Sequence, residues 1–221
     1  MDGKVNWILL FMAIFYQHQI NENTRLGVWK IEEPESFFSQ KVPIKKDVSH
    51  PHKRLQHLAG RYLLTWLFPD FPLEEVLIAD TRKPFLLNEA YHFSISHCGD
   101  FAAAIASKVS RVGVDVELVS AKVSRIKHKF LNDFEWQLAN NANSGISEEE
   151  QLTALWSAKE SIFKWYSLGE MDFRRHMFLN GKIQPGAEWM EMPFEFKKGT
   201  SISLTVQARI FDSLVLAYVV S

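Results

Sequence analysis

Two short segments of the sequence carry carboxylates at spacings that could hold a metal ion. In the first, residues 113–117, Asp115 and Glu117 are two positions apart and would point to the same face of a strand. Two carboxylates at that separation repel each other unless a cation lies between them. Taken alone, the segment is more typical of a half-exposed strand with its polar residues outward than of a metal site.

The second segment, residues 156–164, would place Glu160 and Lys164 side by side on a helix. A surface ion pair is the simplest interpretation, and it would contribute little to stability. However, Trp156 and Phe163 flank the same face and indicate that Glu160 is partly buried. A partly buried carboxylate favours a nearby cation. With the two carboxylates of the first segment it would complete a set of three oxygen ligands suited to Mg²⁺, with Mn²⁺ also possible.

Two further segments could bind phosphate. Ser96 and His97 lie at the end of a predicted strand, where their side chains would face a cleft. Lys83 precedes Pro84, whose ring fixes the backbone and could hold the lysine toward an anion. Each of these segments alone is more typical of an ordinary turn.

The hydrophobic pattern predicts two long helices and several strands. Apolar residues at helical spacing indicate a helix over residues 55–68, and a second helix over 148–166 follows a capping-box pair, Ser147 and Glu150. Gly113 lies within a predicted strand and indicates close approach of another backbone. The strands are predicted around residues 29–31, 76–78, 93–95, 102–106, 112–118, 183, 201–210 and 214–220.

The order of these elements, a helix followed by strands, occurs twice. Such a mixture indicates an α+β fold, and the repetition predicts two similar α+β halves in a pseudo-twofold arrangement. We place the boundary so that residues 1–110 form the N-terminal half and residues 111–221 the C-terminal half.

Composition limits the functions that this chain can have. Its 25 Lys and Arg residues nearly balance its 26 Asp and Glu residues, so neither nucleic acid nor another polyanion is attracted to the molecule as a whole. The single cysteine, Cys98, rules out an intramolecular disulfide and fits a reducing cytoplasm. The apolar run at 7–16 is too short to span a membrane and has no signal-peptide cleavage site, so we expect it to be buried in the domain.

Taken in order, four segments resemble the 4′-phosphopantetheinyl transferase superfamily. The size and the doubled pattern resemble its larger, monomeric class, which activates surfactin-type peptide synthetases. The resemblance is strongest over residues 54–170. The segments that carry it are residues 83–85, 93–97, 113–117 and 156–164.

The resemblance implies that the chain moves the phosphopantetheine arm of coenzyme A to a serine of an apo acyl or peptidyl carrier protein. Adenosine 3′,5′-bisphosphate would be the other product. The implied metal ligands are Asp115, Glu117 and Glu160. The implied contacts to coenzyme A are Arg54, Lys83, Ser96, His97, Lys159 and Lys164. The implied catalytic residues are Glu160 as a base, Lys164 at the leaving phosphate, and Glu135 in an assisting position.

The resemblance also divides the work between the two halves. The N-terminal half would contact the phosphates of coenzyme A, and the C-terminal half would carry the metal site and the catalytic helix. A basic segment at 122–130 would then be either a solvated face with an apolar underside or a docking surface for an acidic carrier-protein helix. Its cations are Lys122, Arg125, Lys127 and Lys129.

Two other functions would use the same residues. A metal-dependent phosphoester hydrolase would cleave coenzyme A with water in place of the carrier serine. A non-catalytic module would bind coenzyme A or a carrier protein without turnover.

Overall fold

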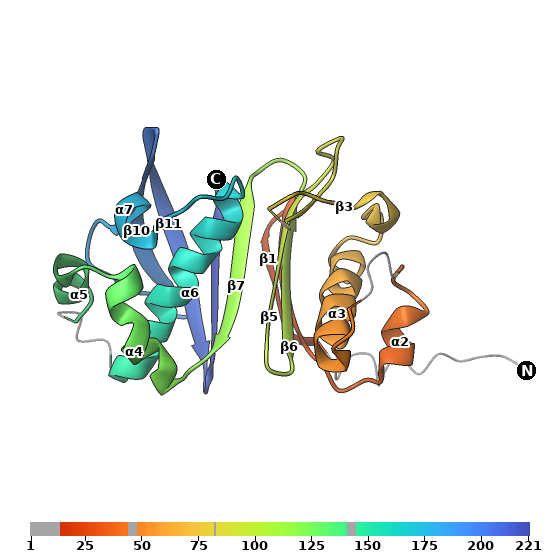
Figure 1. Ribbon diagram of the computed structural model, residues 1–221, viewed down its shortest axis with the longest axis horizontal. Helices are drawn as coiled ribbons and strands as arrows, with labels where there is room; N and C mark the ends of the chain where they lie inside the picture. Colours follow the sequence, from red (N-terminus) through yellow and green to blue (C-terminus); the bar gives the residue numbers. More distant parts are fainter. Residues whose placement is uncertain (1–13, 44–47, 82, 141–144) are drawn as a thin grey trace, which may run out of the picture.

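The computed structural model describes residues 14–43, 48–81, 83–140 and 145–221 of the chain (Figure 1). It confirms a mixed fold of helices and antiparallel sheets. Most of the apolar run at 7–16, which was expected to be buried, lies outside the described residues. Within the described part of the chain, no helix has both the length and the apolar character needed to cross a membrane.

The first sheet is built from the N-terminal part of the chain. Its strands are ordered β1 (Ile14–Asn21), β2 (Thr24–Lys30), β6 (Phe101–Ser107) and β5 (His92–Cys98). Helix α3 (Pro51–Leu67) packs on one face, with the short helix α2 (Glu35–Ser39) beside it. A 3-10 turn, η1 (Leu73–Glu75), and a small hairpin of β3 (Leu77–Ile78) and β4 (Pro84–Phe85) precede β5.

The second sheet is built from the C-terminal part. Its strands are ordered β7 (Val112–Leu118), β12 (Leu214–Val220), β11 (Thr200–Phe211), β10 (Met190–Lys198) and β8 (Met177–Leu179), and β9 (Gln184–Pro185) pairs with β10. Helix α6 (Glu148–Tyr166) packs on one face of this sheet. The other helices in the described residues are α4 (Ala121–Phe130), α5 (Asp133–Asn140) and α7 (Phe173–His176).

Both sheets contain the same connection pattern. The series β2, α3, β5, β6 and the series β7, α6, β11, β12 each run strand, helix, strand, strand. In each sheet the last strand of the series lies between the other two. The two series share this order when the shorter elements between their members are left out.

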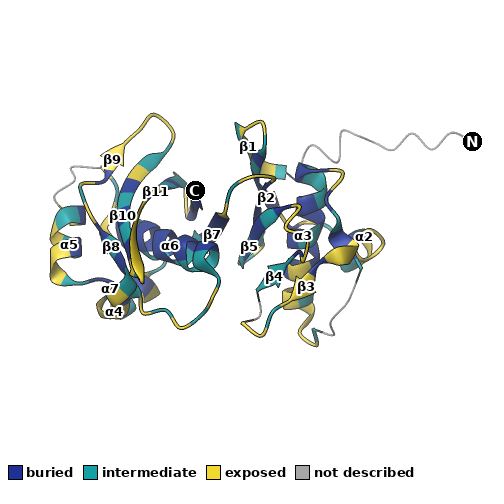
Figure 2. Cartoon of the chain, turned by 90° about the horizontal axis from the view of Figure 1, so that it is seen from above, coloured by how far each residue is buried: buried dark blue, intermediate teal, exposed yellow. Residues whose placement is uncertain are grey.

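The two sheets face each other, and their long helices lie on the outer sides (Figure 1). Alternation along β6 explains why. Ala102, Ala104 and Ala106 belong to the core beneath α3, whereas Ala103 and Ile105 belong to the core between the sheets. Both sets are fully buried, and Figure 2 shows the buried residues running through the centre of the molecule. Small side chains let the sheet accept a helix on one side and a second sheet on the other.

The predicted helices are confirmed, with small differences at their ends. Helix α6 has the predicted bounds, and the Ser147 and Glu150 capping box is formed. Helix α3 begins four residues before the predicted start, because Pro51 suits the first helical position and the His50 side chain accepts a hydrogen bond from the Lys53 amide.

The sequence analysis missed two long strands, β1 and β10. The partial apolar run gave no clear strand signal at β1. In β10 the buried positions do alternate, at Met192, Phe194 and Phe196. Pro193 interrupts that run and is unusual in a strand with neighbours on both sides. The carbonyl of Pro193 accepts a hydrogen bond from the Asn180 amide.

Gly113 makes the close approach that the sequence predicted, because helix α6 crosses β7 at this residue. A Cβ atom placed on Gly113 would lie 2.0 Å from the carbonyl oxygen of Ser161 and 2.7 Å from the amide nitrogen of Trp165. Both atoms are backbone, so neither can turn aside. The helix can therefore reach the carboxylates of β7 only because residue 113 has no side chain.

We predict that Gly113→Ala destabilises the protein by about 3 kcal/mol, because it pushes α6 away from β7. Urea unfolding measures the effect. Gly27→Ala is the matched control, since its added Cβ would meet side-chain carbons of Leu63 and Leu67 at 3.1 and 3.2 Å, while the nearest backbone atom, the Tyr16 oxygen, lies at an ordinary contact distance of 3.6 Å. Equal stability of the Gly113→Ala variant and wild type would contradict this account of the packing.

Candidate functional site

Asp115 lies at the junction of the two halves and joins three elements. Its side chain is 2% exposed. The Oδ1 atom accepts hydrogen bonds from Ser96 Oγ of β5 at 2.8 Å and from Lys164 Nζ of α6 at 2.5 Å, and Oδ2 accepts from Ser157 Oγ of α6 at 2.8 Å. Lys164 Nζ also donates to Ser96 Oγ at 2.7 Å. A charged pair with this little solvent contact is held by both halves at once.

Glu117 is the next residue on the same face of β7. The Cys98 thiol donates to Oε2 at 3.3 Å, and the Trp156 indole Nε1 donates to Oε1 at 3.4 Å. Burial raises the pKa of Glu117, and the charge of Asp115 raises it further. Both effects favour the neutral acid over the carboxylate unless a cation is present.

Glu160 belongs to the same electrostatic group. Burial raises its pKa to about 7, the negative charges of Asp115 and Glu117 add to the rise, and the ammonium group of Lys164 opposes it. The three carboxyl groups therefore influence one another, as the sequence analysis expected. A side chain that titrates near neutral pH can both hold and release a proton under ordinary conditions.

The donor set suits a hard divalent cation. All three candidate ligands offer carboxylate oxygens, and the mutual repulsion of Glu117, Glu160 and Asp115 is the condition that a bound cation relieves. Within the described residues, however, no group of three such side chains is close enough to form a ready-made metal site. In this arrangement Lys164 supplies the positive charge beside Asp115.

Two predicted phosphate contacts lie next to this junction. Ser96 is buried and bonds directly to Asp115 and Lys164. The half-buried ring of His97 lies 5.3 Å from the ring of His57 on α3, measured between centroids. Burial lowers the pKa of His97, and the charge of Lys164 lowers it further.

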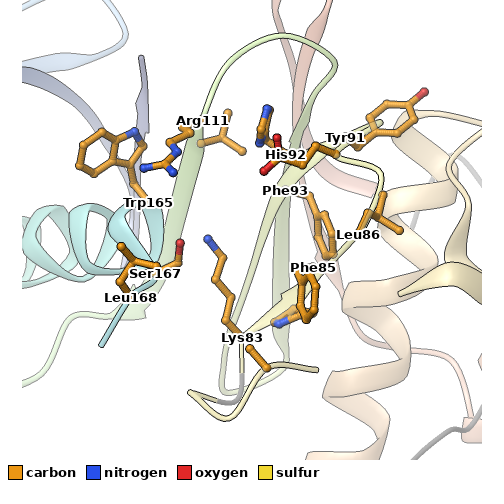
Figure 3. A pocket seen from close by; sticks show the side chains of 14 residues that line it. Lys83, Phe85, Leu86, Tyr91, His92, Phe93, Arg111, Trp165, Ser167 and Leu168 are labelled. Carbon is orange, nitrogen blue, oxygen red and sulfur yellow. The ribbon is translucent and has the colours of Figure 1, made fainter. Parts of the chain in front are cut away.

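Lys83 lines a cavity of about 280 Å³ between the two halves (Figure 3). Its Nζ donates to the carbonyl oxygen of Lys164 at 2.8 Å. Burial, together with the nearby charge of Arg111, lowers the pKa of Lys83 to about 8. The cavity thus joins two cations to aromatic walls that include Phe85, Phe93 and Trp165.

Arg54, also predicted to contact coenzyme A, is held at the start of α3. Its guanidinium pairs with Glu35 at 2.8 Å and donates to the carbonyl of Val48 at 3.2 Å. It is three residues before His57, so both lie on the same side of the helix. His57 contacts the ring of His97.

The structure places Lys159 and Glu135 away from the junction, in contrast to the prediction. Both are fully buried, and Lys159 Nζ lies 2.6 Å from Glu135 Oε1. Lys159 therefore does not reach a phosphate, and Glu135 does not reach a reacting group. The physical reason is helical geometry: adjacent residues point about 100° apart, so Lys159 cannot share the face of Glu160. We remove both residues from the candidate site.

Three residues of the site were not assigned any function from the sequence. Ser157 and Trp156 bond to the carboxylates of β7, and Arg111 lines the cavity opposite Lys83. The spacing of Ser157, three residues before Glu160, could have identified it because such residues share a helix face. Arg111 has no comparable signal, since only the fold brings it to Lys83.

Comparison with known proteins finds a family that matches the C-terminal part of this arrangement. Residues 111–219 match the family model of the 4′-phosphopantetheinyl transferase superfamily. This range contains the strand that carries Asp115 and Glu117 and the helix that carries Glu160. It confirms, at the level of the superfamily, the resemblance found in the sequence.

Several curated proteins are similar to part of the chain. Enterobactin synthase component D of Escherichia coli K12 is 32% identical over 115 residues, which is 51% of this chain and 54% of that protein. The 4′-phosphopantetheinyl transferase AcpT of the same strain is 30% identical over 117 residues, 51% of this chain and 57% of that protein. The Xenopus laevis L-aminoadipate-semialdehyde dehydrogenase-phosphopantetheinyl transferase is 26% identical over 130 residues, 51% of this chain and 43% of that protein. The matched region thus spans about half the length of each relative.

We predict that Glu160→Gln stabilises the protein at high pH. The folded pKa of Glu160, about 7, lies above its ordinary value of 4.5, so wild type loses stability as pH rises from 4.5 to 7, whereas the glutamine does not titrate. Above pH 7 the free energy of unfolding of the variant should exceed that of wild type by about 2 kcal/mol, a value that allows for partial solvent contact of the side chain. Urea titrations at pH 5 and pH 8 without divalent cations measure it. A difference that does not grow with pH would contradict the placement of Glu160.

Proposed function

We propose that this chain, whose residues 111–219 match the 4′-phosphopantetheinyl transferase superfamily, moves the phosphopantetheine arm of coenzyme A to a serine of an apo carrier protein. Adenosine 3′,5′-bisphosphate is the second product. The observation that carries the proposal is the junction of the halves, where Asp115, Glu117 and Glu160 lie within electrostatic reach of one another and of Lys164.

Coenzyme A fits between the halves in this proposal. Its anionic phosphates require local cations, because the chain as a whole is nearly neutral. Lys83 and Arg111 offer two of them in the cavity, and Lys164 offers a third beside Ser96 and His97. The aromatic walls of the cavity suit a nucleotide base, which can pack on flat apolar surfaces. Arg54 remains a proposed contact on the side of α3.

Mg²⁺, or Mn²⁺ with the same oxygen preference, would be held by Asp115, Glu117 and Glu160. When bound, it would neutralise charge on the diphosphate of coenzyme A. Hydrogen bonds already orient two of these side chains: Ser157 holds Asp115, and Trp156 holds Glu117. Such supporting contacts fix the direction of a ligand's oxygens.

The transfer itself depends on positioning and charge. The hydroxyl oxygen of the carrier serine attacks the phosphorus that bears the pantetheine arm, and the bond from that phosphorus to the bridging diphosphate oxygen breaks. Glu160 is the proposed acceptor of the serine proton. Lys164 is the proposed donor to the departing phosphate, since its ammonium group lies at the junction.

Helix α4 is the proposed docking surface for the carrier protein. It follows β7 directly and packs against α6. Its underside, including Val123 and Phe130, is buried in the core, whereas Lys122, Arg125 and Lys129 are exposed. An exposed basic face on a helix that packs against α6 suits a partner with an acidic helix. The exposed ring of Phe134, on the next helix, adds an apolar contact to this surface.

The remaining parts of the proposal concern the whole chain. The division at residue 110, between β6 and β7, and the repeated topology support two halves related by a pseudo-twofold axis. One chain supplies both sides of the junction, which supports a monomer of the larger class. A cytoplasmic location fits the unpaired thiol of Cys98. The chain's balanced charge supports the expectation of no nucleic-acid partner.

We predict that the purified protein adds one phosphopantetheine group to an apo acyl carrier protein when coenzyme A and Mg²⁺ are present. Intact mass spectrometry of the carrier measures the gain. EDTA should abolish it, and Lys164→Ala should lower kcat by about 100-fold, because a charge-stabilising donor is lost.

Other outcomes of this assay favour other functions. Cleavage of coenzyme A with an unmodified carrier would replace the transferase with a hydrolase. Calorimetric binding of coenzyme A or carrier, without any reaction across several carriers, would support a binding module instead.

We predict that reversing two charges on α4, as in Lys122→Glu with Arg125→Glu, raises KM for the carrier by about 10-fold, because acidic and basic surfaces then repel. The KM for coenzyme A should stay constant. Steady-state kinetics at two salt concentrations measure both KM values. Added salt should reduce the difference in carrier KM between the variant and wild type. The control is Lys41→Glu, at an exposed lysine that follows α2 and is not part of α4. An unchanged carrier KM would remove α4 from the proposed interface.

A further inference from the structure

The buried pair of Lys159 and Glu135 ties together five segments of the C-terminal half. Lys159 Nζ lies 2.6 Å from Glu135 Oε1 of α5 and is surrounded by three backbone carbonyls. These belong to Phe130 at the end of α4, at 2.6 Å, to Met177 at the start of β8, at 2.8 Å, and to Phe173 of α7, at 3.1 Å. Four acceptors for three N–H bonds leave no proton of this ammonium group for a ligand.

Glu135 completes the same arrangement. Its Oε1 also accepts from the Leu179 amide at 2.9 Å, and its Oε2 accepts from the Asn132 amide at 3.1 Å. Breaking one member of a fully buried ion pair leaves the other charge uncompensated. The pair therefore fixes the backbone of the segments around it.

Two of those segments hold the side chain that contacts Glu117. The rings of Phe130 and Phe173 pack against the Trp156 indole, with centroid separations of 5.2 and 5.5 Å. These are the residues whose carbonyls Lys159 binds. Trp156 in turn donates its Nε1 proton to Glu117 Oε1. A continuous series of contacts thus runs from the buried pair to a carboxylate of the junction.

We propose that Lys159 and Glu135 are positioning residues that hold the Trp156 indole against Glu117. Lys159 fixes the backbone of Phe130 and Phe173, their rings fix the indole, and the indole orients the carboxylate. Phe130 is also the last residue of α4, so the pair sets where the basic helix ends. The catalytic consequence rests on the proposed transferase function, whereas the effect on the indole does not.

The first measurement is independent of activity. In an ¹⁵N-labelled sample, the indole N–H signal of Trp156 is identified by its loss in Trp156→Phe, and Glu117→Gln shows how far it moves when its acceptor changes. The Lys159→Met/Glu135→Gln double variant removes both buried charges and keeps similar shapes. We expect it to shift or broaden the Trp156 signal. An unchanged signal in a folded double variant would overturn the proposal.

A matched control separates positioning from general loss of stability. Leu204→Ala removes buried volume from the same core, on β11, and should leave the Trp156 signal in place. Movement of the signal in this control equal to that in the double variant would also overturn the proposal. If the double variant does not fold, Glu135→Gln alone should produce a smaller shift of the Trp156 signal. An unmoved Trp156 signal in Glu135→Gln would then overturn the proposal.

The second measurement applies once transfer is observed. The double variant should lower kcat by about 10-fold, as the loss of supporting contacts around a ligand does, with KM for coenzyme A unchanged. The triple variant that also carries Trp156→Phe should have the same kcat as Trp156→Phe alone, because the buried pair and the indole act through one contact. A raised KM for coenzyme A with an unchanged indole signal would instead make Lys159 a phosphate contact. Absence of transfer in wild type would defeat the proposed function and leave the indole measurement valid.

Discussion

The carboxylate of Asp115 is the interaction on which the rest of the structure depends. It is almost fully buried, and a buried charge is costly unless it is paired and hydrogen-bonded. Its partners come from both halves: Ser96 from the N-terminal sheet, and Ser157 and Lys164 from the C-terminal helix. The halves must therefore meet in one register for this charge to be tolerated. The same contacts leave Glu117 and Glu160 nearby with raised pKa values, and so create the demand for a cation.

The close packing of α6 against β7 brings the partners of these carboxylates into contact with them. Gly113 lets the helix backbone approach the strand, and only then can Ser157 and Lys164 reach Asp115. Farther along the strand, Trp156 reaches Glu117 while Phe130 and Phe173 hold its indole. Most side-chain contacts to Asp115 and Glu117 thus come from one helix, α6, packed against one strand, β7. The surrounding core holds this helix and this strand together.

Much of this could be predicted from the sequence where the signal is local. The alternation that pairs Asp115 with Glu117, the helical spacing of Glu160 and Lys164, and the capping box of α6 each follow from neighbours along the chain. Lys159 was wrongly assigned to the phosphates because the family resemblance was followed, although helical spacing already indicated that Lys159 and Glu160 point in different directions. The position of Arg111 near Lys83 in one cavity and the contacts around Trp156 could not be foreseen, because they involve residues that only the folded sheets bring together. Strand β10 was missed because Pro193 interrupts a pattern that its neighbours otherwise keep.

The position of β12 affects when β7 gains a neighbouring strand during synthesis of the chain. This strand, residues 214–220, lies between β7 and β11, so β7 has no hydrogen-bonded neighbour in its own sheet until those residues are available. Contacts between segments so far apart in the sequence are slow to form, since the intervening chain must first be ordered. A nascent chain that has completed β7 and α6 still lacks the strand that pairs with the backbone of β7. The sheet that carries Asp115 and Glu117 is therefore complete only after β12 has paired with β7.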